Sequence, residues 1–389
     1  NIKHKNIILR ADLNVPVVDG KITDKSRIKI IIPTINSLKI NKNKIFIVSH
    51  YGRPKGKKDD KYSLKFLSSI LQKELLIDKI FFLESLEDKK INKTINKMLP
   101  GDICIVENIR FYPQEEKNDL NFAKKIAKNF DAYVNDAFSA SHRNHASITG
   151  IPKFIPSFAG LSLVREIKNI DYFFKQPSKP NLAIIGGSKV STKIDLLYNL
   201  SKSFDSIVIG GAMANTFLFA NGIDIGISLC EKNLSDLALK IMQEAKKNKC
   251  KIILPIDVVC SNNLDDKINI RKCNVSKIEP NQMALDVGQK TINLISEYIL
   301  KSKMILWNGP LGAFEYKPFN KSSISIANII KKNSKLLNIP SIAGGGDTVS
   351  AINSVNAEDG FTYISNAGGA FLEWLEGNQS PGIIALENN

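Results

Sequence analysis

Cysteine is rare in this chain, and long apolar runs are missing. The five cysteines are an odd number with no C-x-x-C pair and no regular spacing, so the sequence indicates neither a disulfide framework nor a zinc cluster. No apolar stretch approaches the roughly 20 residues that a membrane-spanning helix needs. No apolar segment of a signal peptide follows the polar, basic N-terminus. We therefore expect a cytoplasmic protein without membrane contact.

Arginine is also scarce, because only seven of the 54 basic side chains are Arg. A guanidinium group is planar and binds phosphate or carboxylate through two parallel hydrogen bonds, which an ammonium group cannot do. The positions that keep Arg are therefore expected to need this geometry. Six of the seven precede residue 166, and four of these lie in or beside predicted loops or element ends: Arg27, Arg53, Arg110 and Arg143. The first half of the chain is predicted to hold a multiply charged anion.

The net charge of +16 allows two interpretations. A strongly basic protein favours polyanions such as nucleic acids. Most of the excess, however, is Lys scattered through segments rich in Asn and Ile, such as Lys39, Lys42 and Lys44. We interpret this excess as a bias in amino-acid usage and expect no specific nucleic-acid partner.

Length and periodicity predict two α/β domains. A chain of 389 residues with 43% hydrophobic content exceeds what one core usually serves. Short apolar runs alternate with helical patterns throughout, which is typical of parallel sheets covered on both faces. The segment 161–174 has helical spacing and ends before a Gln-Pro-Ser-Lys-Pro stretch. We predict two doubly wound parallel-sheet, Rossmann-like domains with a cleft between them, joined by this connecting helix.

In open α/β sheets, ligands bind beyond the carboxyl ends of the strands. In the first half, the residues expected there are Asp12, Asn14, His50, Arg53, 107–110, Asn135, Asp136, His142 and Arg143. In the second half they are mostly glycines, at 186–187, 210–211, 309, 344–346 and 368–369. One domain thus offers charged side chains and the other offers bare backbone, which suits phosphate chains. This division indicates phosphoryl transfer between a nucleotide and a small anion.

The stretch 184–193 reads as a strand, a glycine turn and a helix start. Lys189 and Lys193 are four residues apart, so we expect both ammonium groups on one face of the first helical turns, where a bound phosphate would offset their repulsion. The alternative is a solvated helix start without a ligand. The stretch is not a Walker A loop, because G-x-x-x-x-G-K-[ST] is absent.

Two further segments follow predicted strands in the second half. In Gly344 to Thr348, three glycines precede Asp347, which could hold Mg²⁺ beside a phosphate site or could merely cap a helix. In Trp307 to Glu315, the carboxylate of Glu315 is a candidate partner for ribose hydroxyls.

Two basic segments of the first half also allow simpler interpretations. The stretch Ser49 to Gly56 could be a solvated loop, and we accept that interpretation for Lys57 and Lys58. The stretch Ser141 to His145 could suggest zinc, but it lacks Cys or acidic partners, so we favour contact with an anion.

Together these motifs resemble the phosphoglycerate kinase family, in order and along nearly the whole chain. The matching stretches are 10–16, 49–54, 107–111, 135–145, 186–193, 210–217, 306–315, 344–348 and 368–377. The resemblance implies reversible transfer of the acyl phosphate of 1,3-bisphosphoglycerate to ADP, giving 3-phosphoglycerate and ATP with Mg²⁺, by a monomer. The attacking or leaving group is a carboxylate, which is already ionised near neutral pH, so no general base is needed.

The resemblance also implies roles for individual residues. Those implied for binding the glycerate and its stable phosphate are Asp12, Leu13, Asn14, Arg27, His50, Tyr51, Gly52, Arg53, Arg110 and Arg143. Those implied for the nucleotide are Lys193, Glu315, Gly345, Gly346, Asp347 and Thr348, with Asp347 at the metal. Those implied for the transferred phosphoryl group are Arg27 and Lys189, with backbone N–H groups of Gly345, Gly346, Gly368 and Gly369.

The implied domains are a 3-phosphoglycerate-binding domain at 1–158, a connecting helix and hinge at 159–180, and a nucleotide-binding domain at 181–376. The segment 377–389 is expected to pack back onto the first domain, and transfer is expected to require domain closure. Ser139 and Ala367 stand where the family commonly has Gly, and Gln289 stands where it commonly has Pro.

The sequence leaves two other classes of protein as alternatives to a phosphoglycerate kinase. A dinucleotide-dependent dehydrogenase should show G-x-G-x-x-G after an early strand, and no strand here carries it. A protein that binds nucleic acid or acidic partners is suggested by the charge alone, but aromatic and Arg residues do not alternate on one element.

Overall fold

The computed structural model describes residues 2–175, 177–266, 268–365 and 367–388. The chain forms two compact units, Asn1–Lys168 with Gln379–Asn389, and Asn169–Asn378. The boundary between them falls inside helix α7 (Leu161–Lys175). It therefore lies within the predicted connecting segment 159–180, of which Gln176 is outside the described residues. Each unit contains a six-stranded parallel sheet, so the predicted α/β class with two doubly wound sheets is confirmed.

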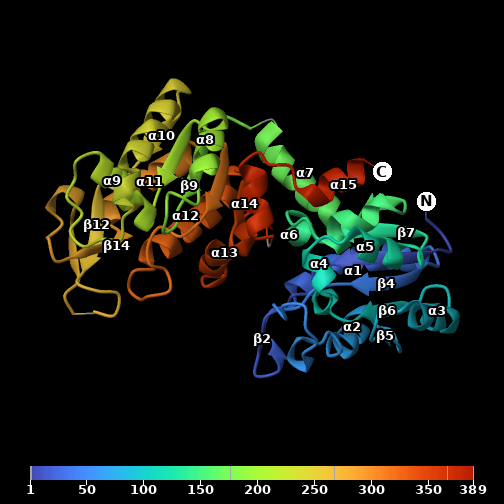
Figure 1. The fold of residues 1–389 in the computed structure, drawn as a ribbon. Coiled ribbons are helices and arrows are strands. Elements are labelled where there is room, and N and C mark those ends of the chain that lie inside the picture. The colour runs from blue at the N-terminus through green and yellow to red at the C-terminus, as the bar shows by residue number, and fades with distance from the viewer. Residues whose placement is uncertain (1, 176, 267, 366, 389) are drawn as a thin grey trace. The chain divides into compact units, whose positions relative to one another are not determined.

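The sheet of the first unit has the order β5-β6-β4-β1-β7-β8, and every pairing is parallel (Figure 1). Its strands are β1 (Asn6–Ala11), β4 (Lys44–Val48), β5 (Phe81–Leu83), β6 (Ile103–Val106), β7 (Ala132–Asp136) and β8 (Ser157–Ala159). A hairpin of β2 (Val17–Val18) and β3 (Lys21–Ile22) lies apart from this sheet. The edge strand β8 was not predicted, because its Ser-Phe-Ala sequence carries no apolar run.

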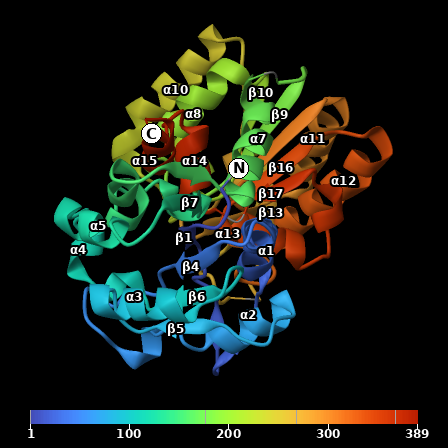
Figure 2. The same cartoon turned by 90° about the vertical axis from the view of Figure 1, so that its right-hand side faces the viewer.

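Helices cover both faces of this sheet (Figure 2). The helices are α1 (Ser26–Ile40), α2 (Leu67–Leu75), α3 (Asp88–Lys97), α4 (Pro113–Glu116), α5 (Leu120–Ala127) and α6 (Phe138–Ser141). Because side chains alternate along a strand, Ile7 and Leu9 pack with residues of α1 and α2, whereas Ile8 packs with residues of α3 and α5. The interior strands are consequently almost wholly apolar, and this apolar character allowed them to be predicted from the sequence.

The last helix of the chain, α15 (Pro381–Glu387), belongs to the first unit. Leu386 packs against the hydrophobic cluster on the α3 and α5 face. Gly382 lies very close to an earlier segment of the same chain, because an added Cβ would lie 2.7 Å from Ile148 and 3.1 Å from Ser141. Helix α15 is therefore held by close packing.

The sheet of the second unit has the order β11-β10-β9-β15-β16-β17, again with parallel pairing. Its strands are β9 (Asn181–Ile185), β10 (Ser206–Ile209), β11 (Lys251–Ile253), β15 (Met304–Asn308), β16 (Ser341–Gly344) and β17 (Tyr363–Ser365). The helices are α8 (Ile194–Ser203), α9 (Ala212–Ala220), α10 (Ser235–Lys247), α11 (Gln289–Lys301), α12 (Lys321–Leu337), α13 (Gly346–Asn353) and α14 (Gly369–Leu375). Trp307 is fully buried in the cluster that packs this sheet against α11, α12 and α13.

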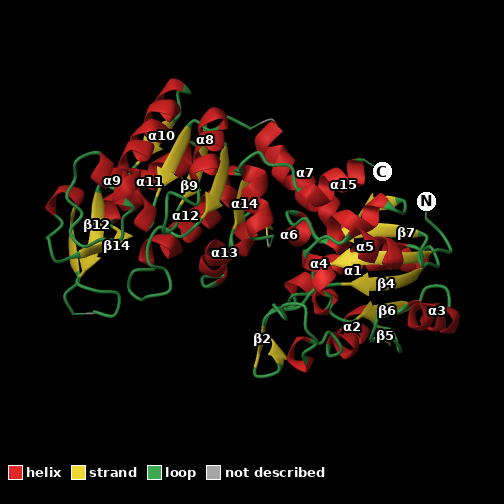
Figure 3. Cartoon of the chain, viewed as in Figure 1, coloured by secondary structure: helices red, strands yellow, loops and turns green. Residues whose placement is uncertain are grey.

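A three-stranded antiparallel sheet also belongs to the second unit and was not predicted. It consists of β12 (Asp257–Ser261), β13 (Arg271–Asn274) and β14 (Met283–Val287), in the order β13-β12-β14. Strand β14 contacts α9, and Figure 3 shows these strands at one side of the unit. Strand β13 reads Arg-Lys-Cys-Asn, with alternating exposure and no apolar run, so it gave no strand signal.

Helix α7 begins where the carboxyl end of β7 provides a cap. The Oδ1 atom of Asp136 accepts hydrogen bonds from the backbone N–H groups of Ser162 and Leu163, each at 2.9 Å. The N–H of Leu161 donates to Thr34 Oγ1 at 3.0 Å. These bonds satisfy groups that the first helical turn leaves unpaired. Among the described residues, no helix has the length and apolar character needed to span a bilayer.

Candidate functional site

The predicted anion-binding residues of the first unit lie at one edge of its sheet, because the carboxyl ends of parallel strands share an edge. Asp12, Leu13 and Asn14 follow β1, and 50–53 follow β4. Arg110 follows β6 within a short 3₁₀ helix, and Arg143 follows α6 beyond β7. Arg27 comes from the first turn of α1 and reaches the same edge, where it forms an ion pair with Asp12.

Asp12 is a buried carboxylate with two donors on one oxygen. Its Oδ2 atom accepts short hydrogen bonds from Arg27 Nη1 and from Ser139 Oγ. Burial alone would raise the pKa of Asp12, but attraction to the Arg27 guanidinium and the hydrogen bond from Ser139 hold it well below its usual range. Asp12 is thus a fixed anion that orients the guanidinium of Arg27.

Asn14, Gly52 and Arg110 form a second connected group. The N–H of Gly52 donates to Asn14 Oδ1 at 2.9 Å, and Arg110 Nη1 donates to Gly52 O at 2.8 Å. Gly52 has a φ of +60°, and a Cβ there would lie 2.4 Å from the ring of Tyr62, so glycine is required. Burial and the nearby Arg143 lower the pKa of Arg110 to about 10. Arg110 nevertheless remains charged at neutral pH.

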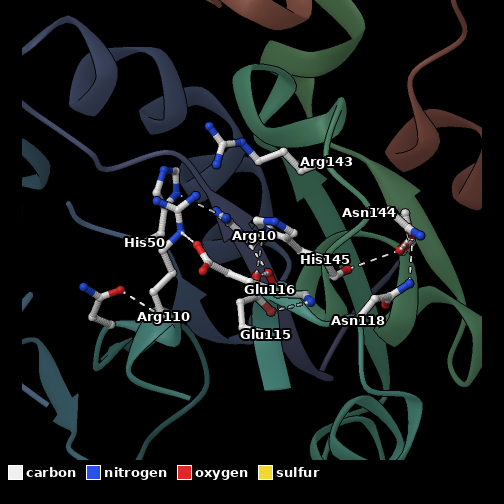
Figure 4. Close-up of polar contacts among 12 residues, drawn as sticks. Arg10, His50, Arg110, Glu115, Glu116, Asn118, Arg143, Asn144 and His145 are labelled. Carbon is white, nitrogen blue, oxygen red and sulfur yellow. Dashed lines mark hydrogen bonds and ion pairs between the residues drawn. The ribbon is translucent and has the colours of Figure 1, made fainter. Parts of the chain in front are cut away.

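His50 is buried among positive charges (Figure 4). Its Nδ1 atom lies 3.3 Å from Arg10 Nη2. Burial lowers the pKa of His50 well below its ordinary value, and Arg10, Arg110 and Arg143 lower it further against the opposing effect of Asp12. The imidazole is therefore neutral at pH 7, and the positive charge of the site comes from arginines.

The side chains of the other predicted substrate-binding residues differ in burial and contacts. Leu13 is fully buried in the core, whereas Tyr51 is half-buried, with its ring centroid 5.4 Å from that of Phe66. Arg53 is exposed, and within the described residues it has no hydrogen bond or ion pair. Arg143 is half-buried, with its Nε atom 3.3 Å from His142 Nε2.

Sequence reasoning missed the polar network beneath these residues. Arg10, 1% exposed on β1, donates to Ser147 Oγ at 2.9 Å, and Ser147 Oγ donates to Glu115 Oε1 at 2.6 Å. Glu115 is fully buried. The position of a scarce Arg inside an apolar strand was a signal for Arg10, whereas nothing in the sequence marked Glu115 or Ser147.

At the sheet edge of the second unit, the helix after β9 begins later than predicted. Helix α8 starts at Ile194, so Lys189 and Lys193 do not share a face of its first turns, and that expectation was wrong. The segment before α8 is instead a turn, which Glu231 holds by accepting from the N–H and the hydroxyl of Ser191. Lys189 is exposed, and Lys193 immediately precedes the helix.

Lys193 turns back toward the ends of two strands. Its Nζ atom donates to Gly186 O and to Asn308 Oδ1, each at 2.6 Å. Burial lowers the pKa of Lys193 to about 8, although Asp347 and Glu376 raise it. This pKa keeps most of the ammonium protonated at neutral pH but makes its charge sensitive to mild alkali.

The glycines at this edge fall into two groups. A Cβ on Gly186 would lie 1.9 Å from the carbonyl oxygen of Pro310, so this glycine permits the close approach of two loops. Around Gly346 and Gly368, by contrast, an added Cβ would meet nothing within 4 Å. The second group therefore borders open space, as backbone that receives a ligand must.

A pocket of about 310 Å³ lies beside these loops, within the second unit. It is lined by Gly187, Ser188, Gly211, Ala212, Leu229, Leu264, Met283, Ala284, Leu285, Pro310, Gly312, Ala313, Phe314, Glu315, Tyr316 and Asp347. Its walls are mostly apolar, and its two carboxylates come from Glu315 and Asp347, both exposed side chains. Such a lining suits a flat apolar ring with polar substituents.

Thr348 and Asp347, which are predicted to bind the nucleotide and the metal, differ in exposure. Thr348 is fully buried, and its Oγ1 atom accepts from the N–H of Gly309 at 2.7 Å. Asp347 stands exposed in the first turn of α13. In the described part of the chain, no group of three or more His, Cys, Asp or Glu is placed to hold a metal ion.

Known proteins are similar to this chain along its whole length. The family model described as phosphoglycerate kinase matches residues 1–378. The phosphoglycerate kinases of Chelativorans sp. (strain BNC1) and Allorhizobium ampelinum are 43% and 44% identical over 387 and 386 residues, covering 100% and 99% of this chain and 97% and 96% of theirs.

Solved structures are similar over the same extent. The phosphoglycerate kinase of Coxiella burnetii is 36% identical with a TM-score of 0.89, covering 100% of this chain and 97% of that one. The phosphoglycerate kinase of Pyrococcus horikoshii OT3 is 26% identical with a TM-score of 0.83, covering 99% and 96%. The chain therefore belongs to the phosphoglycerate kinase family.

Proposed function

We propose that the first unit binds 3-phosphoglycerate or 1,3-bisphosphoglycerate at its basic sheet edge and that the second unit binds ADP or ATP. Membership of the family makes the chain a phosphotransferase of glycolysis, and its reaction is the reversible transfer of the acyl phosphate of 1,3-bisphosphoglycerate to ADP. The assignment rests on the different residues that lie at the carboxyl edges of the two parallel sheets. Arginine side chains gather at one, and open glycine backbone beside a largely apolar pocket lies at the other.

The residues at each edge suit their proposed partners. Arg27, Arg110 and Arg143 offer planar forks for the phosphate and carboxylate of the glycerate, and Asn14 and the neutral His50 offer hydrogen bonds. For the nucleotide, the apolar pocket suits the base, Glu315 suits the ribose hydroxyls, and Lys193 with the N-terminus of α13 suits the phosphates.

The proposed chemistry needs charge neutralisation and positioning. The reacting carboxylate of 3-phosphoglycerate is ionised at neutral pH, so no side chain has to remove a proton from it. Arg27 and Lys189 would neutralise the charge of the moving phosphoryl group. Backbone N–H groups at Gly345, Gly346, Gly368 and Gly369 would stabilise its equatorial oxygens.

Mg²⁺ is part of the proposal, through the nucleotide. Asp347 is an exposed carboxylate on the wall of the pocket, in the first turn of α13. Mg²⁺ usually keeps several waters and takes one or two carboxylates plus substrate phosphates, so a single Asp suits it. When bound, the ion would neutralise phosphate charge. We further propose that the protein acts as a cytoplasmic monomer, which light scattering of the purified chain would test.

A coupled assay tests the function directly. Purified protein with ATP, Mg²⁺ and 3-phosphoglycerate should form 1,3-bisphosphoglycerate, detected by NADH oxidation through glyceraldehyde-3-phosphate dehydrogenase. Reactions without 3-phosphoglycerate serve as the control. Absence of turnover, together with selective DNA binding in a gel shift at physiological salt, would instead support the interpretation suggested by the net charge.

Nucleotide affinity should fall as pH rises through about 8. In the free protein the pKa of Lys193 is about 8 because the side chain is buried, so its positive charge is lost above that pH. We expect the Kd for ATP, measured by titration calorimetry, to rise several-fold between pH 7 and pH 9. A Lys193→Arg variant keeps its charge over this range and should show a flatter profile. Equal pH dependence in both proteins would contradict the role given to Lys193.

Transfer should require the two units to close around both substrates. The proposed glycerate residues all belong to the first unit and the proposed nucleotide residues to the second. Reacting atoms must approach to about 3 to 3.5 Å with water excluded. The radius of gyration from solution scattering should therefore be smaller with 3-phosphoglycerate and nucleotide together than with either alone. An unchanged radius at full activity would show that helix α7 and the segment after it are not a hinge.

A further inference from the structure

Arg10 is a buried cation that the proposed reaction does not use directly. It projects from β1 and is 1% exposed, and its guanidinium donates to Ala11 O and Ser147 Oγ. The remaining nitrogen, Nη2, lies 3.3 Å from Nδ1 of His50. Figure 4 shows Arg10 between His50 and the Glu115 carboxylate. Arg10 thus touches a predicted substrate-binding residue from below.

This contact determines where the proton of His50 resides. A guanidinium has donors but no acceptor, so Nδ1 of His50 must be the acceptor of the hydrogen bond. In a neutral imidazole the proton then occupies Nε2. Within the described residues, Nε2 of His50 has no hydrogen-bond partner. This atom is not buried, so it is accessible to solvent. An N–H donor is therefore free for a ligand.

A buried acid holds Arg10 in place. Glu115 is fully buried and accepts from Ser147 N at 2.8 Å and from Ser147 Oγ at 2.6 Å. The same hydroxyl accepts from Arg10, and the carbonyl oxygen of Ser147 accepts from the Tyr133 hydroxyl at 2.8 Å. Burial raises the pKa of Glu115, while attraction to Arg10 lowers it. The acid thus offsets the charge of Arg10 in a place where an unpaired cation would be costly.

We propose that Arg10, held by Ser147 and Glu115, is a positioning residue that keeps His50 as the Nε2–H tautomer, so that a neutral imidazole donates one hydrogen bond to the anionic substrate. The tautomer follows from the geometry of the free protein, and the role toward substrate rests on the function proposed above. A neutral donor suits this edge because Arg27, Arg110 and Arg143 already supply charge. An imidazolium would repel these arginines before any substrate arrived.

Nitrogen NMR of ¹⁵N-histidine-labelled protein measures the tautomer without any assay. His50→Gln identifies the His50 resonances among the four histidines. We expect Nδ1 of His50 to resonate in the region of an unprotonated ring nitrogen and Nε2 in the region of a protonated one. In Arg10→Met, the two nitrogens should shift toward an average of both tautomers, or His50 should titrate near its ordinary pKa.

Kinetics then connect the tautomer to substrate binding. In Arg10→Met, the KM for 3-phosphoglycerate should rise roughly tenfold, as expected for losing one hydrogen bond to a charged group, with a smaller change in kcat. If this variant does not fold, Arg10→Met with Glu115→Gln removes both buried charges and should show the same tautomer shift. Arg271→Met is the matched control, because it breaks an exposed ion pair to Glu279 and an exposed hydrogen bond to Lys277 O, both far along the chain from the proposed glycerate residues.

Two results would overturn the inference. One is a wild-type His50 protonated on Nδ1, and the other is an Arg10→Met variant that keeps both the wild-type tautomer and the wild-type KM. Lack of turnover by the wild-type protein would refute the proposed function instead and would leave the NMR result standing.

Discussion

Arg27→Lys should lower kcat by more than about tenfold without unfolding the protein. The side chain lies in the first turn of α1, where one arm of its guanidinium binds Asp12. A Lys would keep the charge and the ion pair, but it would lose the second arm that we assign to the moving phosphoryl group. Removing one partner of a desolvated charged contact costs roughly 2 to 5 kcal/mol, and each 1.4 kcal/mol or so on the barrier is about a tenfold change in rate.

The measurement compares kcat of Arg27→Lys with that of wild type at saturating 3-phosphoglycerate and ATP. Arg271→Lys provides the control, because it makes the same exchange at an exposed ion pair of β13. Melting temperatures of both variants should match wild type within a few degrees. A wild-type kcat for Arg27→Lys would show that this arginine does not act on the transferred group.

The two sheets and their ligand-bearing edges could be predicted because the signal is local and periodic. Strands buried on both faces form continuous apolar runs, and parallel pairing places every carboxyl end at the same edge. Asp12, His50 and Arg110 were thus assigned to one edge from their positions after three different strands. The antiparallel sheet escaped prediction because β13 is polar and partly exposed, so it lacks the apolar run on which that reasoning depended.

The orientation of side chains could not be predicted, because it depends on tertiary contacts. The spacing of Lys189 and Lys193 indicated a shared helical face, but Glu231 holds the segment as a turn from 40 residues away in the sequence. The ammonium of Lys193 consequently points to Gly186 and Asn308. Likewise, no local pattern could show that Leu13 is wholly buried.

The three departures from the family pattern have different surroundings. Ser139 gains a function that glycine could not have, since its hydroxyl donates to Asp12 beside Arg27. Gln289 is the first residue of α11, a position that suits Pro, and its side chain donates to Asn293 at the exposed surface. Ala367 is buried directly before the open backbone of Gly368. Of the three, Ser139 contacts the proposed glycerate site directly.

A pair of glycine variants should separate packing from phosphate binding in the second unit. Gly186→Ala places a methyl group 1.9 Å from the carbonyl oxygen of Pro310, and backbone cannot move aside as a flexible side chain can. Overpacking of this kind typically costs about 1 to 3 kcal/mol. The melting temperature of Gly186→Ala should therefore fall by several degrees, with lost activity following from lost structure.

Gly346→Ala should have the opposite profile. Its added methyl meets no protein atom within 4 Å, and Ala suits a helix better than Gly by up to about 1 kcal/mol, so the melting temperature should stay level or rise. The methyl would instead occupy the space that a phosphate needs to reach the first N–H groups of α13, and losing such a donor typically costs 10²-fold or more, so we expect kcat/KM for ATP to fall at least about tenfold. Full activity in a stable Gly346→Ala would mean that phosphate does not approach this backbone. The open space around Gly346 would then serve loop geometry alone, and the nucleotide phosphates would have to be placed nearer Lys193 and the glycines after β9.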